Sequence, residues 1–240
     1  MNGPIDFQTT AWTQILRIGN VQEQESRKLL ESLIHSYWRP VFSYIRRRGR
    51  DASTAEDLTQ EFFANILERN TLGNIEREGG TFRSYLLQAI RNFLISQHRY
   101  DRAAKRDPGA PILAISNMDS AVEPATPMEA DAEAEFDRAW ALQIMELTLD
   151  SMRAEHEISD KLVAFTVFEH QLRHRLQTGK TPSRQDIASK FDLPLKKIDN
   201  ILYRAKKVFR RHLNQTVSQT VTREEQIDEE IRGLRGVLGS

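Results

Sequence analysis

The sequence of 240 residues contains no cysteine, so it cannot form a disulfide, a thiolate zinc site or a cysteine nucleophile. It also lacks an apolar run close to the roughly 20 residues that a membrane-spanning helix needs. Its first residues lack the cationic start and apolar middle of a signal peptide. These absences exclude several enzyme classes and a membrane partner, and they favour a protein of the cytoplasm.

Motifs for catalysis are missing as well. The sequence has no Gly-rich phosphate loop, no nucleophile elbow and no paired-carboxylate motif. His170 and His174 lie one helical turn apart, a spacing that can bind zinc, but neither a third ligand nor a catalytic Glu motif accompanies them. We therefore expect no catalytic residue, no metal and no cofactor, and we interpret the two histidines as ordinary helix-surface residues.

The net charge is zero at pH 7, but the charges are distributed unevenly. Segment 107–160 carries 13 acidic and 2 basic residues, whereas segment 161–213 carries 13 basic and 4 acidic residues. Segment 39–106 is also basic, with 13 basic and 8 acidic residues. Two basic blocks on either side of an acidic one favour polyanionic partners, because phosphate binding is mainly electrostatic.

Apolar residues recur at helical intervals almost throughout, without sustained period-two alternation, so we predict an all-α fold. A first long helix is expected over 22–48, with a kink at Pro40 and an end at Gly49. Ser53 and Glu56 form a capping-box pattern for a second helix. A third helix is expected from about residue 81 to 106.

The composition predicts how these helices are divided into domains. Four prolines and many acidic residues over 107–134 predict an extended, mobile linker. The predicted division is a helical domain over 1–106, the linker, a second helical domain over 135–214 and an acidic amphipathic extension over 215–240.

Segment 182–213 has the pattern of a helix-turn-helix. Ser183 and Asp186 cap a short helix, Asp192 lies in a turn, and a longer basic helix follows. Its outward side chains can donate to guanine, pair with adenine or contact phosphates. We predict that the DNA-binding residues of this helix are Lys196, Lys197, Asn200, Tyr203, Arg204 and Lys207. The alternative interpretation is a solvated amphipathic helix in a bundle.

Motifs in both halves resemble those of a known family. The N-terminal motifs are Asp57-Leu58-Thr59-Gln60-Glu61-Phe62-Phe63, Gly80-Thr81-Phe82-Arg83-Ser84-Tyr85-Leu86 and Arg91-Asn92. They resemble the promoter-melting domain of sigma-70-type RNA polymerase sigma factors. The C-terminal residues that resemble the family's helix-turn-helix signature are Ile187-Ala188, Leu193, Ile198 and Tyr203-Arg204-Ala205. The order of parts resembles the two-domain extracytoplasmic-function group, over residues 10–106 and 135–214.

The resemblance implies roles for individual residues of the first domain. It implies docking on the clamp coiled coil of the polymerase β′ subunit by Asp57, Gln60, Glu61 and Phe62. It implies contact with the melted minus-ten element by Arg83, Asn92, Gln97, His98, Arg99 and Arg102. Cations and amides suit a single strand with an extruded base. A helix with its own core stripe explains Phe62 equally well, and a solvated basic helix end explains the second set.

Two positions depart from the family's usual pattern. Ser96 stands where the family commonly has an acidic residue, which bears on base preference. Asp192 stands where it commonly has glycine, although aspartate tolerates a left-handed turn better than most side chains.

The linker and the C-terminal tail have their own interpretations. Since the family's linker passes through basic channels of the polymerase, the resemblance implies that acidic side chains substitute for RNA phosphates; a soluble tether is the equal alternative. These side chains are Asp119, Glu123, Glu129, Asp131, Glu133 and Glu135. The tail resembles the C-terminal extension of a sigma subgroup. We expect it to fold back on the second domain or to recruit a regulator.

Together these resemblances predict a non-catalytic specificity subunit of RNA polymerase, with the second domain reading the minus-thirty-five element. The implied partners are core polymerase, through the β′ clamp helices and the β subunit, promoter DNA, and a regulatory protein that acts on the C-terminal extension. Two alternatives remain open. One is a conventional helix-turn-helix regulator with an N-terminal dimerisation or sensing domain, and the other is a helical adaptor that binds acidic proteins.

Overall fold

The structure, a computed structural model, describes residues 23–69, 81–106, 127–159, 161–221 and 224–239, and all of its regular elements there are helices. This confirms the predicted all-α fold. The chain divides into two compact units, residues 1–139 and residues 140–240. The division falls inside one helix, α5 (Pro127–Ile158), which contributes to both units. Among the described helices, none is long and apolar enough to cross a membrane.

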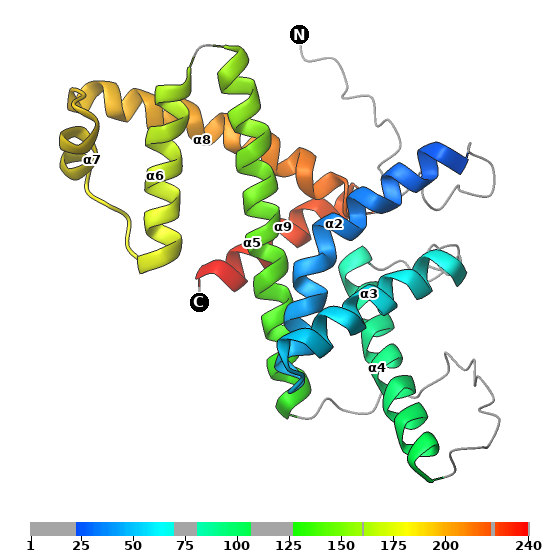
Figure 1. Ribbon diagram of the computed structural model, residues 1–240. Helices are drawn as coiled ribbons and strands as arrows, with labels where there is room; N and C mark the ends of the chain where they lie inside the picture. Colours follow the sequence, from blue (N-terminus) through cyan, green and yellow to red (C-terminus); the bar gives the residue numbers. More distant parts are fainter. Residues whose placement is uncertain (1–22, 70–80, 107–126, 160, 222–223, 240) are drawn as a thin grey trace. The chain divides into compact units, whose positions relative to one another are not determined.

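Unit 1 begins with a helical hairpin of α2 (Glu23–Arg47) and α3 (Ala52–Arg69), followed by α4 (Phe82–Arg106) (Figure 1). As predicted, Gly49 ends the first helix: its φ of 85° is a left-handed conformation that glycine adopts without a Cβ clash. The helix continues through the buried Pro40.

The start of α3 differs from the prediction. Asp51 caps this helix, because its carboxylate accepts hydrogen bonds from the Thr54 backbone N–H at 3.0 Å and from the Thr54 hydroxyl at 2.6 Å. The predicted capping box of Ser53 and Glu56 is therefore wrong, since both residues lie inside the helix and not at its N-cap. The hydrogen bonds of Thr54 also lower the pKa of the Asp51 carboxyl.

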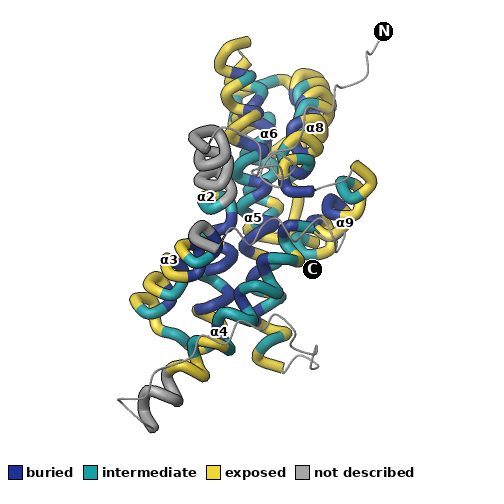
Figure 2. The backbone as a smooth tube through the Cα atoms, turned by 90° about the vertical axis from the view of Figure 1, so that its right-hand side faces the viewer, coloured by how far each residue is buried: buried dark blue, intermediate teal, exposed yellow. Residues whose placement is uncertain are grey.

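Aromatic contacts hold the helices of unit 1 together. Tyr37 of α2 packs edge-on against Phe82 of α4, with ring centroids 4.8 Å apart, and Trp38 stacks on Phe63 at 5.8 Å. Each of α3 and α4 has a buried side and an exposed side, as expected of amphipathic helices (Figure 2). The apolar stripes that were read from the sequence therefore meet in one core.

The first turns of α5 belong to this core, which corrects the predicted linker. Residues 127–134 were expected to be extended, but they are helical, and Ala132 and Phe136 are fully buried. Pro127 is the first residue of the helix, a position where proline costs no hydrogen bond, and alanine and glutamate favour the helix after it. The proline and the acidic residues of this segment suggested a linker, but they belong to the first turns of a helix. The other residues of the predicted linker, 107–126, lie outside the described ranges.

Unit 2 contains the rest of α5 and α6 (Leu162–Thr178), α7 (Arg184–Phe191), α8 (Leu195–Ser218) and α9 (Glu225–Gly239). Its main core is formed by Leu149, Met152, Phe165, Val167, Phe168, Ile187, Ile198, Leu202 and Ala205. The last helix packs against α8 and buries Ile231 and Leu234. The C-terminal extension thus folds back within unit 2, and recruitment of a regulator stays a prediction.

The connection between α7 and α8 has the expected geometry. Ser183 and Asp186 form a reciprocal capping box at the start of α7. Asp192 ends the helix with φ 50° and ψ 50°, and the Leu193 N–H donates to the Ala188 carbonyl at 3.1 Å. Asp192 therefore adopts the left-handed conformation that glycine favours at this position.

Because of this left-handed conformation, we predict that a glycine substitution at Asp192 stabilises the chain, although glycine usually destabilises a folded protein. Asp192→Gly should raise the free energy of unfolding by about 0.5–1 kcal/mol, because the relief of left-handed strain exceeds the entropy gained by the unfolded chain. Ser189→Gly, inside the same helix, should lower it by about 0.5–1 kcal/mol. Urea denaturation of both variants checks this expectation. Destabilisation by both substitutions would contradict it.

Candidate polymerase and nucleic-acid interfaces

The predicted polymerase-docking residues on α3 divide into two groups. Asp57, Gln60 and Glu61 are exposed along this helix, so an acidic and polar edge is available to a partner. Phe62 has only 2% of its surface exposed and packs against Phe63 and Phe93, with centroids 5.3 and 5.6 Å away. The expected exposed aromatic residue is therefore absent at this position, and Phe62 supports the edge from the core.

The predicted minus-ten residues on α4 also differ in their surroundings. His98 and Arg99 are exposed, whereas Asn92 accepts a hydrogen bond from the Gln88 amide at 3.2 Å. The Gln97 amide donates to the Glu61 carboxylate of α3, so a predicted DNA-binding residue and a predicted docking residue contact one another. The side chain of Arg102 lies outside the described residues.

Arg83 lies in a different setting from the exposed end of α4. Its guanidinium donates to the Asp137 carboxylate of α5 at 2.6 Å, and the two side chains are 22% and 28% exposed. Arg83 therefore has a partner within the chain that the sequence did not indicate, and its contact with DNA stays a prediction.

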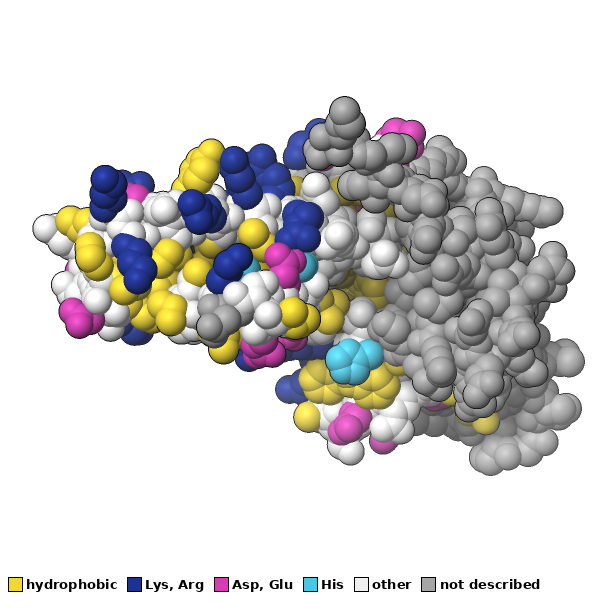
Figure 3. Space-filling view, turned by 90° about the horizontal axis from the view of Figure 1, so that it is seen from above, with side chains coloured by type: hydrophobic (Ala, Val, Ile, Leu, Met, Phe, Trp, Pro, Cys, Tyr) yellow, Lys and Arg dark blue, Asp and Glu magenta, His cyan; other side chains and the backbone are white. Residues whose placement is uncertain are grey.

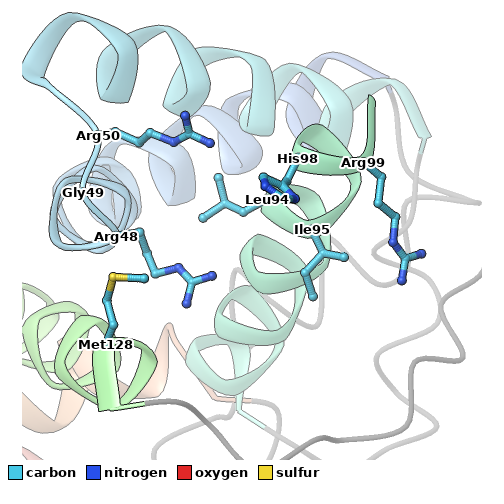
Figure 4. Close-up of a pocket in the computed structure, with 8 residues that line it drawn as sticks. All are labelled: Arg48, Gly49, Arg50, Leu94, Ile95, His98, Arg99 and Met128. Atoms are coloured by element: carbon cyan, nitrogen blue, oxygen red, sulfur yellow. The ribbon is translucent and has the colours of Figure 1, made fainter. Parts of the chain in front are cut away.

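A hollow of about 550 Å³ lies between the end of α2, α4 and the start of α5 (Figure 4). Arg48, Arg50 and His98 point into it, and Arg99 lines its edge but points away. Its apolar lining comes from Leu94, Ile95 and Met128. The hollow can thus accept a group that is anionic on one side and apolar on the other.

Sequence reasoning missed the contribution of α2 and α5 to this hollow. Arg48 and Arg50 flank Gly49 in the basic run 46–50, and a cluster of four arginines at a helix end was the signal that could have revealed them. Met128 gave no such signal, because it was assigned to the linker.

The acidic residues at the start of α5 form ion pairs within unit 1. Glu129 pairs with Arg48 at 2.9 Å, and Asp131 pairs with Arg47 at 3.0 Å. Glu133 accepts a hydrogen bond from the Arg91 guanidinium. These three acids were expected to be solvated in a linker or to bind the polymerase, and here their partners belong to the same chain.

Tyr44 lies beneath these ion pairs. It is fully buried, and its ring contacts Phe136 edge-on with centroids 6.5 Å apart. Burial raises the pKa of its hydroxyl, although the guanidiniums of Arg48 and Arg91 act in the opposite direction. The cationic groups therefore lie at the border of a dry core, where electrostatic interactions are stronger than in water.

The predicted DNA-contacting residues of α8 all lie on the outside of the helix. The exposed residues are Lys196, Lys197, Asn200, Tyr203, Arg204 and Lys207. The opposite side of the helix buries Ile198, Leu202 and Ala205. Figure 3 shows Lys and Arg side chains gathered on the face of unit 2 that carries α8. This face offers several cations to a polyanion at once.

Two local contacts organise this face. The Lys207 ammonium lies 4.6 Å from the centroid of the Tyr203 ring, and its hydrogen bond lowers the pKa of the Tyr203 hydroxyl. Arg184 of α7 pairs with Asp199 of α8 at 2.6 Å, with both side chains largely exposed. The second contact joins the short and the long helix, although an exposed pair contributes little stability.

The histidines of unit 2 have ordinary polar partners. His170 Nδ1 lies 3.2 Å from the Lys190 ammonium, and His174 Nδ1 lies 2.9 Å from the Lys180 carbonyl oxygen. Burial, Lys190 and His174 lower the pKa of His170. Within the described ranges, no group of three His, Asp or Glu side chains is arranged to hold a metal ion.

A cluster that the sequence did not reveal joins α8 to α5 within unit 2. His212 is buried, and its two ring nitrogens lie 2.8 Å from the Ser151 hydroxyl and 2.8 Å from the Glu155 carboxylate. Arg211 donates two hydrogen bonds to Glu155, which lower the pKa of that carboxyl. The carboxylate is thus an ion-pair partner that fixes α8, and the serine belongs to the same polar cluster.

The fold and these surfaces define a class of protein: an all-helical chain with cationic faces suited to nucleic acid and an acidic helix edge suited to a protein partner. Residues 33–104, from within α2 to near the end of α4, match the family model described as sigma-70 region 2. No curated protein and no solved structure matched the chain.

The match supports a sigma-70-family factor with a role in transcription initiation. Factors of this family are non-catalytic specificity subunits of RNA polymerase. The matched region implies binding to core RNA polymerase and to promoter DNA. The matched segment contains the exposed edge of α3 and all three arginines that line the hollow, Arg48, Arg50 and Arg99.

Proposed function

We propose that this chain directs core RNA polymerase to specific promoters, as a two-domain sigma factor of the extracytoplasmic-function group. The observation that carries the proposal is the match of residues 33–104 to sigma-70 region 2. The exposed cationic face of α8, far along the sequence from that match, supports a second DNA contact. The chain itself supplies binding and orientation, and the polymerase performs the chemistry.

In this proposal, unit 1 binds both the polymerase and the opened promoter. Asp57, Gln60 and Glu61 on α3 bind the β′ clamp helices through their acidic and polar side chains. The end of α4, with His98 and Arg99, binds the melted strand of the minus-ten element, because cations there can follow a sugar-phosphate backbone. Arg83, Asn92, Gln97 and Arg102 complete the proposed contact surface along the same helix.

Unit 2 recognises duplex DNA in this proposal. The pair α7 and α8 serves as a helix-turn-helix, with α8 in the major groove at the minus-thirty-five element. Asn200 and Arg204 are suited to base edges, while the lysines are suited to phosphates. The C-terminal helix α9 is the proposed contact for a regulatory protein, through its exposed acidic side chains Glu225, Asp228 and Glu229.

Run-off transcription with core RNA polymerase on a promoter library tests the proposal. We expect discrete transcripts that appear only when the chain is added, since docking, melting and reading must all occur together. The control is the same chain with Lys197, Arg204 and Lys207 replaced by alanine, which should lose transcripts from promoters that need the minus-thirty-five element. Tight, salt-sensitive binding to duplex DNA without any effect on transcription would instead indicate a conventional helix-turn-helix regulator.

A further inference from the structure

The strongest unassigned feature of unit 1 is a row of four arginines that α5 covers. We call Arg47 at the end of α2, Arg48 directly after it, and Arg83 and Arg91 of α4 the arginine row. Its partners are the acidic face of α5, which consists of Glu129, Asp131, Glu133 and Asp137. Each arginine pairs with a different carboxylate, so the two rows match one to one.

Helix geometry explains why the rows match. Glu129, Glu133 and Asp137 are spaced by four residues and therefore lie on one stripe of α5. The neighbouring stripe buries Ala132 and Phe136 in the core. The apolar stripe thus holds the helix in place and the acidic stripe lies on the arginines.

Three of the four ion pairs are partly shielded from solvent. Their side chains are between 16% and 31% exposed, whereas the pair of Arg47 and Asp131 is 57% and 62% exposed. An incoming ligand cannot reach the three shielded guanidiniums fully while the carboxylates stay in contact with them. A ligand of the arginine row therefore has to displace the carboxylates of α5 from the guanidiniums.

The chemistry of the row defines the ligand. A guanidinium presents a planar fork of donors that fits a carboxylate and a phosphate equally well. Four such groups in a row on two packed helices fit a chain of anions, and the phosphates of a nucleic-acid single strand are a chain of that kind.

We infer that the arginine row is a binding surface for a single-stranded nucleic-acid backbone, and that the acidic face of α5 is its intramolecular competitor. The inference rests on the proposed function only in taking the promoter strand as the natural ligand. Binding of the strand exchanges carboxylates for phosphates at Arg83, Arg91 and Arg48 and loosens the acidic stripe of α5, while the apolar stripe keeps Phe136 in the core. Of this row, only Arg83 was expected to contact DNA from the sequence.

The competition has a measurable consequence for affinity. The full-length double variant Glu133→Gln, Asp137→Asn keeps the apolar stripe but removes two competing charges. It should bind a fluorescein-labelled single strand of about twelve thymidines roughly tenfold more tightly at low salt, by fluorescence anisotropy. The slope of log K against log salt concentration should become steeper by about 1.4, since each additional phosphate contact with a single strand adds about 0.7.

The matched control changes the same number of charges elsewhere on α5. Asp150→Asn, Glu157→Gln removes two exposed carboxylates outside unit 1. Its slope should equal that of the wild-type chain. Circular dichroism and the thermal midpoint show whether each variant is folded. An unchanged or weaker affinity of the first variant, or an equal increase in the control, would overturn the inference.

A second measurement needs no substitution. Hydrogen exchange of the wild-type chain, followed by mass spectrometry, should become faster over residues 128–138 when the single strand is added, and should stay unchanged over 142–152. Unchanged or slower exchange over 128–138 with the strand bound would overturn the inference. Both measurements use the chain and the single strand without polymerase. Failure of run-off transcription would therefore refute the proposed function, whereas only the affinity and exchange results decide whether α5 competes for the arginine row.

Discussion

Asp57→Arg is expected to weaken binding of the chain to core RNA polymerase by about 2–4 kcal/mol, or roughly 30- to 1,000-fold in Kd. The side chain is exposed on α3, on the acidic edge that we propose docks on the polymerase. A carboxylate at a protein interface commonly faces a cation, so reversing its charge removes an attraction and adds a repulsion. Surface plasmon resonance with immobilised core enzyme measures this change.

The stability of the chain should hardly respond to the same substitution, because exposed positions away from caps and cores usually change it by about 0.5 kcal/mol or less. Asp150→Arg, which makes the same charge change on an exposed part of α5, is the matched control and should bind core enzyme as the wild-type chain does. Equal loss in both variants would point to net charge as the cause. No loss in Asp57→Arg would remove α3 from the docking surface.

Phe136→Ala should lower the free energy of unfolding of unit 1 by about 3–5 kcal/mol. The ring is fully buried and contacts Tyr44, so its removal leaves a cavity that the surrounding helices cannot fill. For a domain whose total stability is about 5–15 kcal/mol, this loss is large. Urea denaturation followed by circular dichroism and by tryptophan fluorescence measures it.

Arg138→Ala provides the control on the neighbouring exposed position of the same helix, and its effect should stay within about 0.5 kcal/mol. A large difference between the two variants would show that the start of α5 is a helix packed in the core and not a solvated linker. If Phe136→Ala were as mild as Arg138→Ala, the start of α5 would be the solvated segment that its composition suggested.

Local signals in the sequence were sufficient for most helices. Gly49 ended the first helix where the sequence predicted it, and its φ is positive. Ser183 and Asp186 were recognisable as a cap because both partners of a capping box lie within three residues of each other. Such features depend on neighbours in the chain, so spacing alone can reveal them.

The failures share one cause, which is that the partner lies far away in the sequence. Phe62 could equally face the core or a partner, and only its packing against Phe93 showed that it is buried. The acids of α5 resembled a solvated linker because Arg48 and Arg91 are 81 and 42 residues from Glu129 and Glu133. The charge pattern of a sequence shows how many charges a segment carries, but it does not show which charges lie next to them in the folded chain.

By itself the sequence determined the helical fold, the segregation of charge, the outward face of α8 and the resemblance to sigma factors, because each depends on periodicity or on short motifs. The tertiary structure alone decided that α5 completes unit 1 and that its carboxylates cover four arginines. Electrostatic energy falls with distance and with solvent exposure. Which charges attract one another was therefore fixed only when folding brought α2, α4 and α5 together.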